Sequence, residues 1–206
     1  PALEERGYEV AVFHATGMGG RAFESLAAEG AFAAVMDFAP QEVGNHLFGS
    51  SITAGEDRLT AAGANGIPQM VAPGCYDLID FVGWQPVPPA LDGQEIHAHN
   101  RLLSSVLMNT DQRRMMAREL CAKLAEAKGK TVLFVPLKGC NEWDRAGEPL
   151  SDPEGLQAFI EAIREHAPEN VELAELDAHI NDAAFSEAVL DMFDGWVASG
   201  LVAGPK

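Results

Sequence analysis

The chain has few basic residues and no cluster of them. It carries 14 Lys and Arg against 31 Asp and Glu, which gives a formal net charge of −17 at pH 7. Affinity for nucleic acid comes mainly from clustered cations, so the composition argues against a nucleic-acid partner. Long apolar runs are missing as well. No stretch reaches the roughly 18 residues that a membrane helix requires, and we expect no membrane partner.

Cysteine is also scarce. The three cysteines, Cys75, Cys121 and Cys140, are too scattered for a disulfide framework, and no Cys-x-x-Cys motif occurs. Such usage is typical of a reducing compartment, so we expect a cytoplasmic protein. Cys140 follows a predicted strand, where a nucleophile is conceivable, but a small apolar filler is the interpretation that we favour.

Neither of the two common glycine-rich phosphate motifs is present. The sequence contains no Gly-x-x-x-x-Gly-Lys-Ser/Thr, and the spacing of Gly17, Gly19 and Gly20 differs from Gly-x-Gly-x-x-Gly. These glycines nevertheless connect an apolar run, residues 10–14, to a stretch with helical spacing, residues 21–29. A glycine turn that opens a helix presents backbone amides to an anion. We therefore predict a phosphate or carboxylate site at this turn; a plain turn with glycines for close packing is the alternative.

Apolar runs alternate with helical segments along the rest of the chain. The predicted strands are residues 10–14, 33–38, 67–72, 131–135 and 171–176, and the predicted helices are residues 21–29, 57–64, 110–128, 153–166 and 183–199. Residues 73–93 lack periodicity and are interpreted as a long loop. Short apolar strands without alternating polarity are typical of a parallel sheet covered by helices. We predict a single α/β domain over residues 1–206, with a Rossmann-like, doubly wound, mostly parallel sheet of about five strands and helices on both faces.

Polar residues and glycines recur where the predicted strands end. Ligands of such sheets bind beyond the carboxyl ends of the strands, so we expect these residues to converge on one cavity. The candidates for binding are Thr16, Gly17, Gly19, Gly20, Arg21, Gly74, Asn100, Lys138, Gly139 and Asn181. The candidates for acid–base chemistry are His14, His99, His179, Asp177 and Asp182.

Two histidines, His97 and His99, lie on one face if their segment is extended. That spacing is compatible with metal ligation, but two imidazoles do not complete a site, and we predict no metal centre. Hydrogen-bonded histidines or a role in proton transfer are the favoured interpretations. At the other end of the sequence, residues 1–7 are typical of the last turns of a helix that closes at Gly7. Because no Met precedes them, we expect a domain from a longer protein.

Several short sequence motifs occur together in a fixed order along the chain. They are Tyr8-Glu9-Val10, the segment from His14 to Ala22, Ile67-Pro68-Gln69, Ala72-Pro73-Gly74, His99-Asn100, Pro136-Leu137-Lys138-Gly139, Asp152-Pro153-Glu154 and His179-Ile180-Asn181-Asp182. In this order they resemble the second, C-terminal domain of the Tm-one-like ATP-binding proteins, over essentially the whole chain. The family usually has an arginine where this chain has Met108-Asn109-Thr110.

The resemblance implies a two-domain protein whose N-terminal domain is also α/β, together with nucleotide binding and self-association. ATP, with Mg²⁺, is the cofactor that it implies. Our leading hypothesis is a domain that binds a nucleotide or another phosphorylated or carboxylated metabolite. There are two alternatives. One is an enzyme (a hydrolase, lyase or isomerase) that acts on a small anionic metabolite through its His and Asp residues. The other is a protein-interaction module that uses the loop from Trp84 to Pro89.

Overall fold

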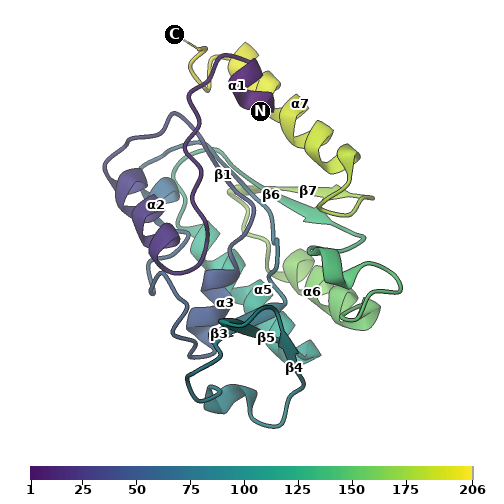
Figure 1. Ribbon diagram of the computed structural model, residues 1–206. Coiled ribbons are helices and arrows are strands. Elements are labelled where there is room, and N and C mark those ends of the chain that lie inside the picture. The colour runs from purple at the N-terminus through teal and green to yellow at the C-terminus, as the bar shows by residue number, and fades with distance from the viewer. Residues whose placement is uncertain (206) are drawn as a thin grey trace.

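The computed structural model describes residues 1–205, which form two sheets surrounded by helices (Figure 1). The larger sheet is parallel, with the strand order β1-β2-β6-β7. The smaller sheet is antiparallel, with the order β3-β5-β4. The strands are β1 (Val35–Asp37), β2 (Gln69–Val71), β3 (Leu78–Val82), β4 (Ile96–Ala98), β5 (Leu103–Leu107), β6 (Thr131–Pro136) and β7 (Val171–Leu176).

Helices cover both faces of the parallel sheet. Alternate residues of β6 point to opposite faces, as strand geometry requires. Leu133 packs in the core beneath α5 and α6, and Phe134 packs in the core beneath α7. Figure 1 shows α7 on one side of the sheet and α5 and α6 on the other. The helices are α1 (Ala2–Glu5), α2 (Met18–Ala28), α3 (Gln41–Leu47), α4 (Ala61–Ala64), α5 (Thr110–Ala125), α6 (Pro153–His166) and α7 (Ala183–Ala198), with 3-10 turns η1 (Pro89–Leu91) and η2 (Glu142–Asp144).

Local sequence signals explain where α5 and α6 begin. Asn109 caps α5 through a reciprocal capping box with Gln112. Asp152 accepts a hydrogen bond from the amide of Gly155, and Pro153 occupies the first position of α6, where its missing N–H costs nothing. These caps fix the starts of the two helices that border the pocket described below.

The two ends of the chain lie side by side (Figure 1). Arg6, just after α1, forms an ion pair of 2.9 Å with Asp194 of α7, and the ring of Tyr8 meets that of Phe193 edge to face. Gly7 has a positive φ of 87°, which confirms that the first helix ends there. No helix among residues 1–205 is long and apolar enough to cross a membrane.

The α/β class and the parallel sheet with helices on both faces are confirmed, but the sheet has four hydrogen-bonded strands. The predicted strand at residues 10–14 is wrong. That segment belongs to no sheet, and Val12 is 88% exposed. A strand needs a partner for its backbone groups, and none of the described residues supplies one.

Two further predictions are corrected. The predicted loop at residues 73–93 contains β3, which pairs with β5. Asp80, a charged residue in the middle of β3, interrupts the apolar pattern that would predict a strand. The structure accommodates it because its carboxylate accepts hydrogen bonds from Gln41 and Ser105. The predicted helix at residues 57–64 is helical only over α4, because Leu59 adopts a positive φ of 73°.

Candidate functional site

The glycine turn before α2 is built around a carboxylate from within the chain. Gly17, with a φ of 95°, caps the helix, and its amide donates a hydrogen bond to the buried side chain of Glu42 in α3. A Cβ on Gly20 would overlap that carboxylate, and one on Gly19 would overlap the carbonyl oxygen of His14. The glycines therefore allow Glu42 to approach the helix start, and it occupies the anion position at the Gly17 amide.

Glu42 belongs to a buried ion-pair cluster around Arg58. Arg58 donates through Nε to Glu42 at 2.7 Å, and through Nη2 to Asp37 at 2.9 Å. Its Nη1 reaches Glu24 at 3.2 Å, and Glu24 also accepts the amides that begin α4. Burial lowers the pKa of Arg58, but the carboxylates of Asp37 and Glu42 raise it by more. The only sign of this cluster in the sequence is an acid, Asp37, at the end of an apolar run.

A second group of residues lies where the four parallel strands end. A Cβ on Gly74, after β2, would overlap the carbonyl oxygen of Phe38 and lie 3.2 Å from Ile180. Gly139, after β6, has a φ of 126°, and a Cβ there would overlap Asp144 and lie 2.7 Å from the ring of His179. Glycine is therefore required at both positions because the neighbouring chain comes so close.

A pocket of about 370 Å³ opens at the ends of β6 and β7, beside the start of α6. The predicted residues Lys138, His179 and Asp182 line it together. The first glycine turn does not line the pocket. The single cavity that we predicted therefore brings together residues from the ends of β6 and β7 only. The charged groups on the pocket wall are the cations Arg113, Lys138 and Arg145 and the carboxylates Asp144, Asp152 and Asp182.

Arg113 of α5 forms the floor of this pocket and is only 2% exposed. Its Nε donates to the carbonyl of Met108 at 3.0 Å, and its Nη1 donates to the hydroxyl of Tyr76 at 3.3 Å. Its Nη2 lies 3.1 Å from Asp152 and 3.8 Å from the buried Asp77, but makes no hydrogen bond of good geometry with any described residue. One nitrogen of a rigidly held guanidinium is thus unsatisfied.

Asp77 lies behind Arg113 and is completely buried. Asn141 donates to one of its oxygens at 2.9 Å, while the other has no hydrogen-bond partner among residues 1–205. Burial raises the pKa of Asp77 from 3.8 to about 6, even though Arg113 opposes the shift. Burial also raises the pKa of Cys75, to about 12, so this neighbouring thiol is protonated and unreactive at neutral pH.

His179 is buried with both ring nitrogens engaged. Its Nδ1 accepts the amide of Asn181 at 3.1 Å, so Nε2 carries the proton. Nε2 lies 2.9 Å from the carboxylate of Asp144 and 3.0 Å from the carbonyl of Asn141. Asp182 accepts the backbone amide of His179, and this bond, with help from Arg145, lowers the pKa of Asp182. The arrangement fixes the loop after β7 in place.

Residues 1–197 match the family described as the C-terminal domain of the uncharacterised protein family UPF0261. The chain belongs to the UPF0261 family. The resemblance drawn from the sequence is thereby confirmed, because the relatives include both UPF0261 proteins and tomato Tm-1 proteins.

Three of the relatives illustrate the similarity. A UPF0261 protein of Brucella melitensis biotype 1 is 48% identical over 202 residues, which cover 98% of this chain and 48% of the relative. One from Clostridium tetani is 36% identical, over 91% of this chain and 46% of the relative. The ToMV resistance protein Tm-1(GCR237) of Solanum lycopersicum is 31% identical, over 93% of this chain and 26% of the relative. The chain thus spans about half the length of its bacterial relatives.

The remaining predicted residues of this UPF0261 domain lie outside the pocket. Asp177 is exposed and pairs with Lys138 at 3.0 Å, and Asn181 donates to Glu142 at 3.0 Å. Asn100 accepts the amides of Leu102 and Leu103 and so shapes a turn. The exposed residues of the first turn that face solvent are His14, Thr16 and Arg21.

The two histidines of the β4 region contact an aromatic ring. His97 and His99 lie 4.9 Å and 5.0 Å from the ring of Trp143, measured between ring centroids. Trp143 belongs to η2, so these contacts join the small sheet to the loop that carries Asp144. Among the described residues, no group of three or more His, Cys, Asp or Glu side chains could hold a metal ion.

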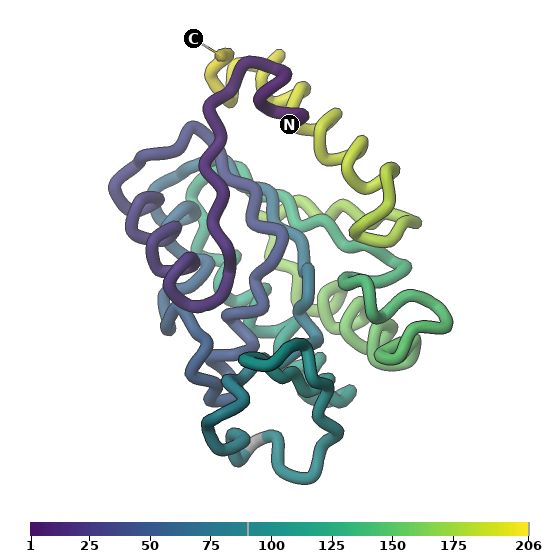
Figure 2. The backbone as a smooth tube through the Cα atoms, in the orientation of Figure 1, coloured from purple at the N-terminus to yellow at the C-terminus, as the bar shows by residue number. Residues whose placement is uncertain are grey.

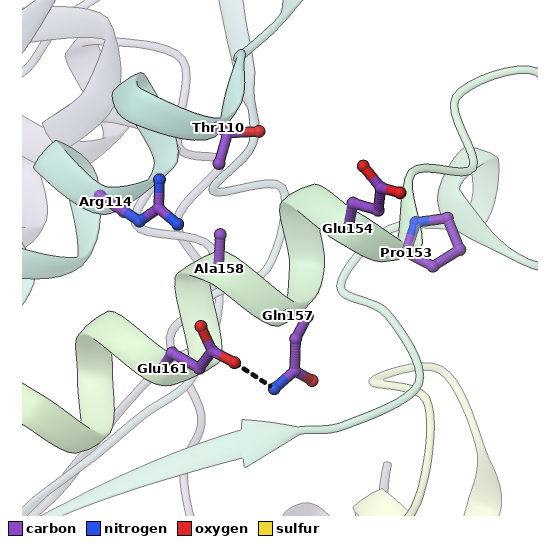
Figure 3. A pocket seen from close by; sticks show the side chains of 7 residues that line it. All are labelled: Thr110, Arg114, Pro153, Glu154, Gln157, Ala158 and Glu161. Carbon is purple, nitrogen blue, oxygen red and sulfur yellow. Dashed lines mark hydrogen bonds between the residues drawn. The ribbon is translucent and has the colours of Figure 1, made fainter.

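A second hollow lies between α5 and α6, away from the strand ends (Figure 3). Arg114 lines it from α5, and Glu154, Gln157 and Glu161 line it from α6. Gln157 and Glu161 are joined by a hydrogen bond of 2.9 Å, drawn as a dashed line in Figure 3. No residue of the predicted site lines this hollow, and we assign the candidate site to the pocket at the strand ends.

Proposed function

We propose that this domain binds a small anionic metabolite, a nucleotide or another phosphorylated or carboxylated compound, in the pocket at the ends of β6 and β7. The observation that carries the proposal is Arg113. Its guanidinium is buried and held by Met108 and Tyr76, while its Nη2 makes no hydrogen bond with any of residues 1–205. A buried cation whose Nη2 has only the ion pair with the partly exposed Asp152 is suited to a charge-assisted hydrogen bond with a ligand oxygen.

The other cations of the pocket can assist because their present partners are at the surface. Lys138 is paired with Asp177, and Arg145 with Glu142 and Asp182. Exposed ion pairs of this kind contribute only about 0–1 kcal/mol each, so a ligand phosphate can replace them at little cost. Asp152 is one-third exposed and keeps its cap of α6 through the amide of Gly155, so a ligand oxygen would bind at Arg113 beside it.

We propose this pocket, and not the glycine turn, as the anion site because the Gly17 amide already receives Glu42. An external phosphate at the turn would have to displace a buried carboxylate that also holds Arg58. That exchange would leave Arg58 short of a partner, which is costly in a buried cluster. ATP carrying Mg²⁺ is the first ligand to try, because the family resemblance implies it.

Isothermal titration calorimetry tests the proposal with ATP, with and without Mg²⁺, and with inorganic phosphate. Arg113→Lys keeps the positive charge but removes the planar guanidinium with its several N–H donors. We expect the affinity for the anion to fall by at least about tenfold, the effect of one charge-assisted hydrogen bond. Lys130→Ala is the matched control, because Lys130 pairs with Glu172 on the surface and does not line the pocket. The absence of binding heat with every anion at millimolar concentration would exclude the proposed function.

A second candidate is an enzyme acting on a small anionic metabolite, favoured by the His179–Asp144 pair in the pocket wall. Proton transfer would require a substrate to replace the amide of Asn181 at Nδ1. His179→Gln distinguishes the two: loss of turnover with retained ligand affinity indicates catalysis. Equal loss of both indicates that His179 only positions the loop.

A protein-interaction role has separate support in Trp84, which is 68% exposed just after β3. Trp84→Ala should then abolish partner binding without changing affinity for small molecules. We further propose a cytoplasmic location, self-association, and contact with an N-terminal domain such as the longer relatives have room for. These follow from the cysteine usage and the family resemblance.

A further inference from the structure

Residues 9–13, here called the arm, have the sequence of a strand but no strand partner. None of the described residues forms a hydrogen bond with the backbone of the arm. Val10 and Val12 are 37% and 88% exposed, although valine is among the best strand formers. Figure 2 shows the arm as the dark purple tube that runs from the N-terminal helix down to the start of α2.

The arm is fixed at both ends. Tyr8 packs against Phe193 of α7, and Phe13 packs against the stacked pair of Phe23 and Phe32, at centroid distances of 5.8 Å and 6.0 Å. The segment is therefore held in one place with its backbone donors and acceptors free. An exposed strand of this kind is a template for pairing with another strand.

Charge distribution indicates what that other strand can be. The protein carries a net charge of −17, so two copies repel each other over most of their surface. Between Tyr8 and Gly20 the only titratable side chains are Glu9 and His14. The arm is thus a nearly neutral, apolar stretch on an otherwise acidic molecule, where two copies can approach.

The arm is also complementary to itself. When two copies pair antiparallel about a twofold axis at Ala11, Val10 of one copy lies opposite Val12 of the other. Glu9 then lies opposite Phe13, so no two like charges face each other. The register brings the two exposed valines of each copy into contact across the pair and satisfies backbone groups that are otherwise left to water.

We propose that the arm is the interface at which two copies of this chain associate, as an antiparallel strand pair centred on Ala11. The inference deepens the self-association proposed above by naming its surface and register. It does not depend on the ligand pocket.

The register can be tested by charge exchange at positions 10 and 12. The double variant V10K/V12K places two lysines directly opposite two lysines and should prevent pairing. The variant V10E/V12K places a carboxylate opposite an ammonium on both sides of the axis and should restore it. M18K is the matched control, because Met18 is 86% exposed but lies outside the arm.

Sedimentation velocity over a concentration series measures association, and amide hydrogen exchange locates it. We expect a concentration-dependent dimer for the wild type, M18K and V10E/V12K, with slowed exchange at residues 9–13, and a monomer for V10K/V12K. A wild type that stays monomeric up to millimolar concentration overturns both self-association and the arm interface. A dimer that persists in V10K/V12K, or that V10E/V12K fails to restore, leaves self-association standing and overturns this interface.

Discussion

Replacing Glu42 by alanine removes a carboxylate that two separate donors require. Its oxygens accept the amide of Gly17 and the Nε of Arg58, and the side chain is fully buried. A hydrogen bond to a charged group contributes about 1.5–3 kcal/mol. Arg58 retains Asp37 and Glu24, so it is not left as an isolated charge. We therefore expect E42A to lower the free energy of unfolding by about 3–5 kcal/mol.

The glutamine variant refines this expectation. E42Q keeps the shape and one acceptor oxygen, but its amide nitrogen must face one of the two donors. We expect a loss of about 1–3 kcal/mol, the usual cost of one unsatisfied buried group. Urea unfolding followed by circular dichroism measures both values. E172A is the control, because it removes a carboxylate from a half-exposed pair with Lys130 and should cost less than about 1 kcal/mol.

The same variants test whether the glycine turn can hold an external anion. In E42A the amide of Gly17 and the Nε of Arg58 both lose this acceptor, so inorganic phosphate should stabilise E42A by more than it stabilises the wild type. Two results would contradict this expectation. One is that E42A loses less than about 1 kcal/mol of the free energy of unfolding. The other is that phosphate stabilises the wild type as strongly as E42A, and that the substitution R113K does not weaken this stabilisation of the wild type. In that case Glu42 is not the anion that completes the turn.

Two other predictions concern the strand ends. Asp77 has its pKa raised from 3.8 to about 6 in the folded state. Its contribution to stability is therefore fully present below pH 3.8 and is lost as the pH rises toward 6. D77N should flatten the dependence of the free energy of unfolding in urea on pH over that window. An unchanged profile would refute the shift. G139A should destabilise the protein by more than G147A. Both glycines have a positive φ, but a Cβ at position 139 would overlap Asp144, whereas a Cβ at position 147 would face open space. Thermal melts of the two variants, expected to differ by at least about 1 kcal/mol, measure the clash separately from the backbone strain.

Those parts of the fold with strong local signals could be predicted from the sequence. The helix α6 has the predicted bounds, and the strand β6 ends one residue later than predicted, because a Pro-initiated, Asp-capped helix and a nearly pure apolar run are determined by their own residues. The strand β3 was missed because its place depends on pairing with β5, more than 20 residues further along the chain. Arg113 was missed as well, since it lies on the buried face of α5 beside Met116, where a cation is unexpected.

The glycine turn shows why a site is harder to predict than a fold. A glycine-rich helix start attracts an anion whether that anion is a ligand or a side chain, so the same residues are compatible with both. The deciding residue, Glu42, is 25 positions from Gly17 and reaches it only because α3 follows β1 at the same sheet edge. Arg113 presents the opposite case, a buried cation for which the described residues, 1–205, provide no complete set of hydrogen-bond partners. The distinction between a filled and an unfilled charge site is therefore a property of tertiary contacts, and it directs the search for the ligand to the pocket beside β6 and β7.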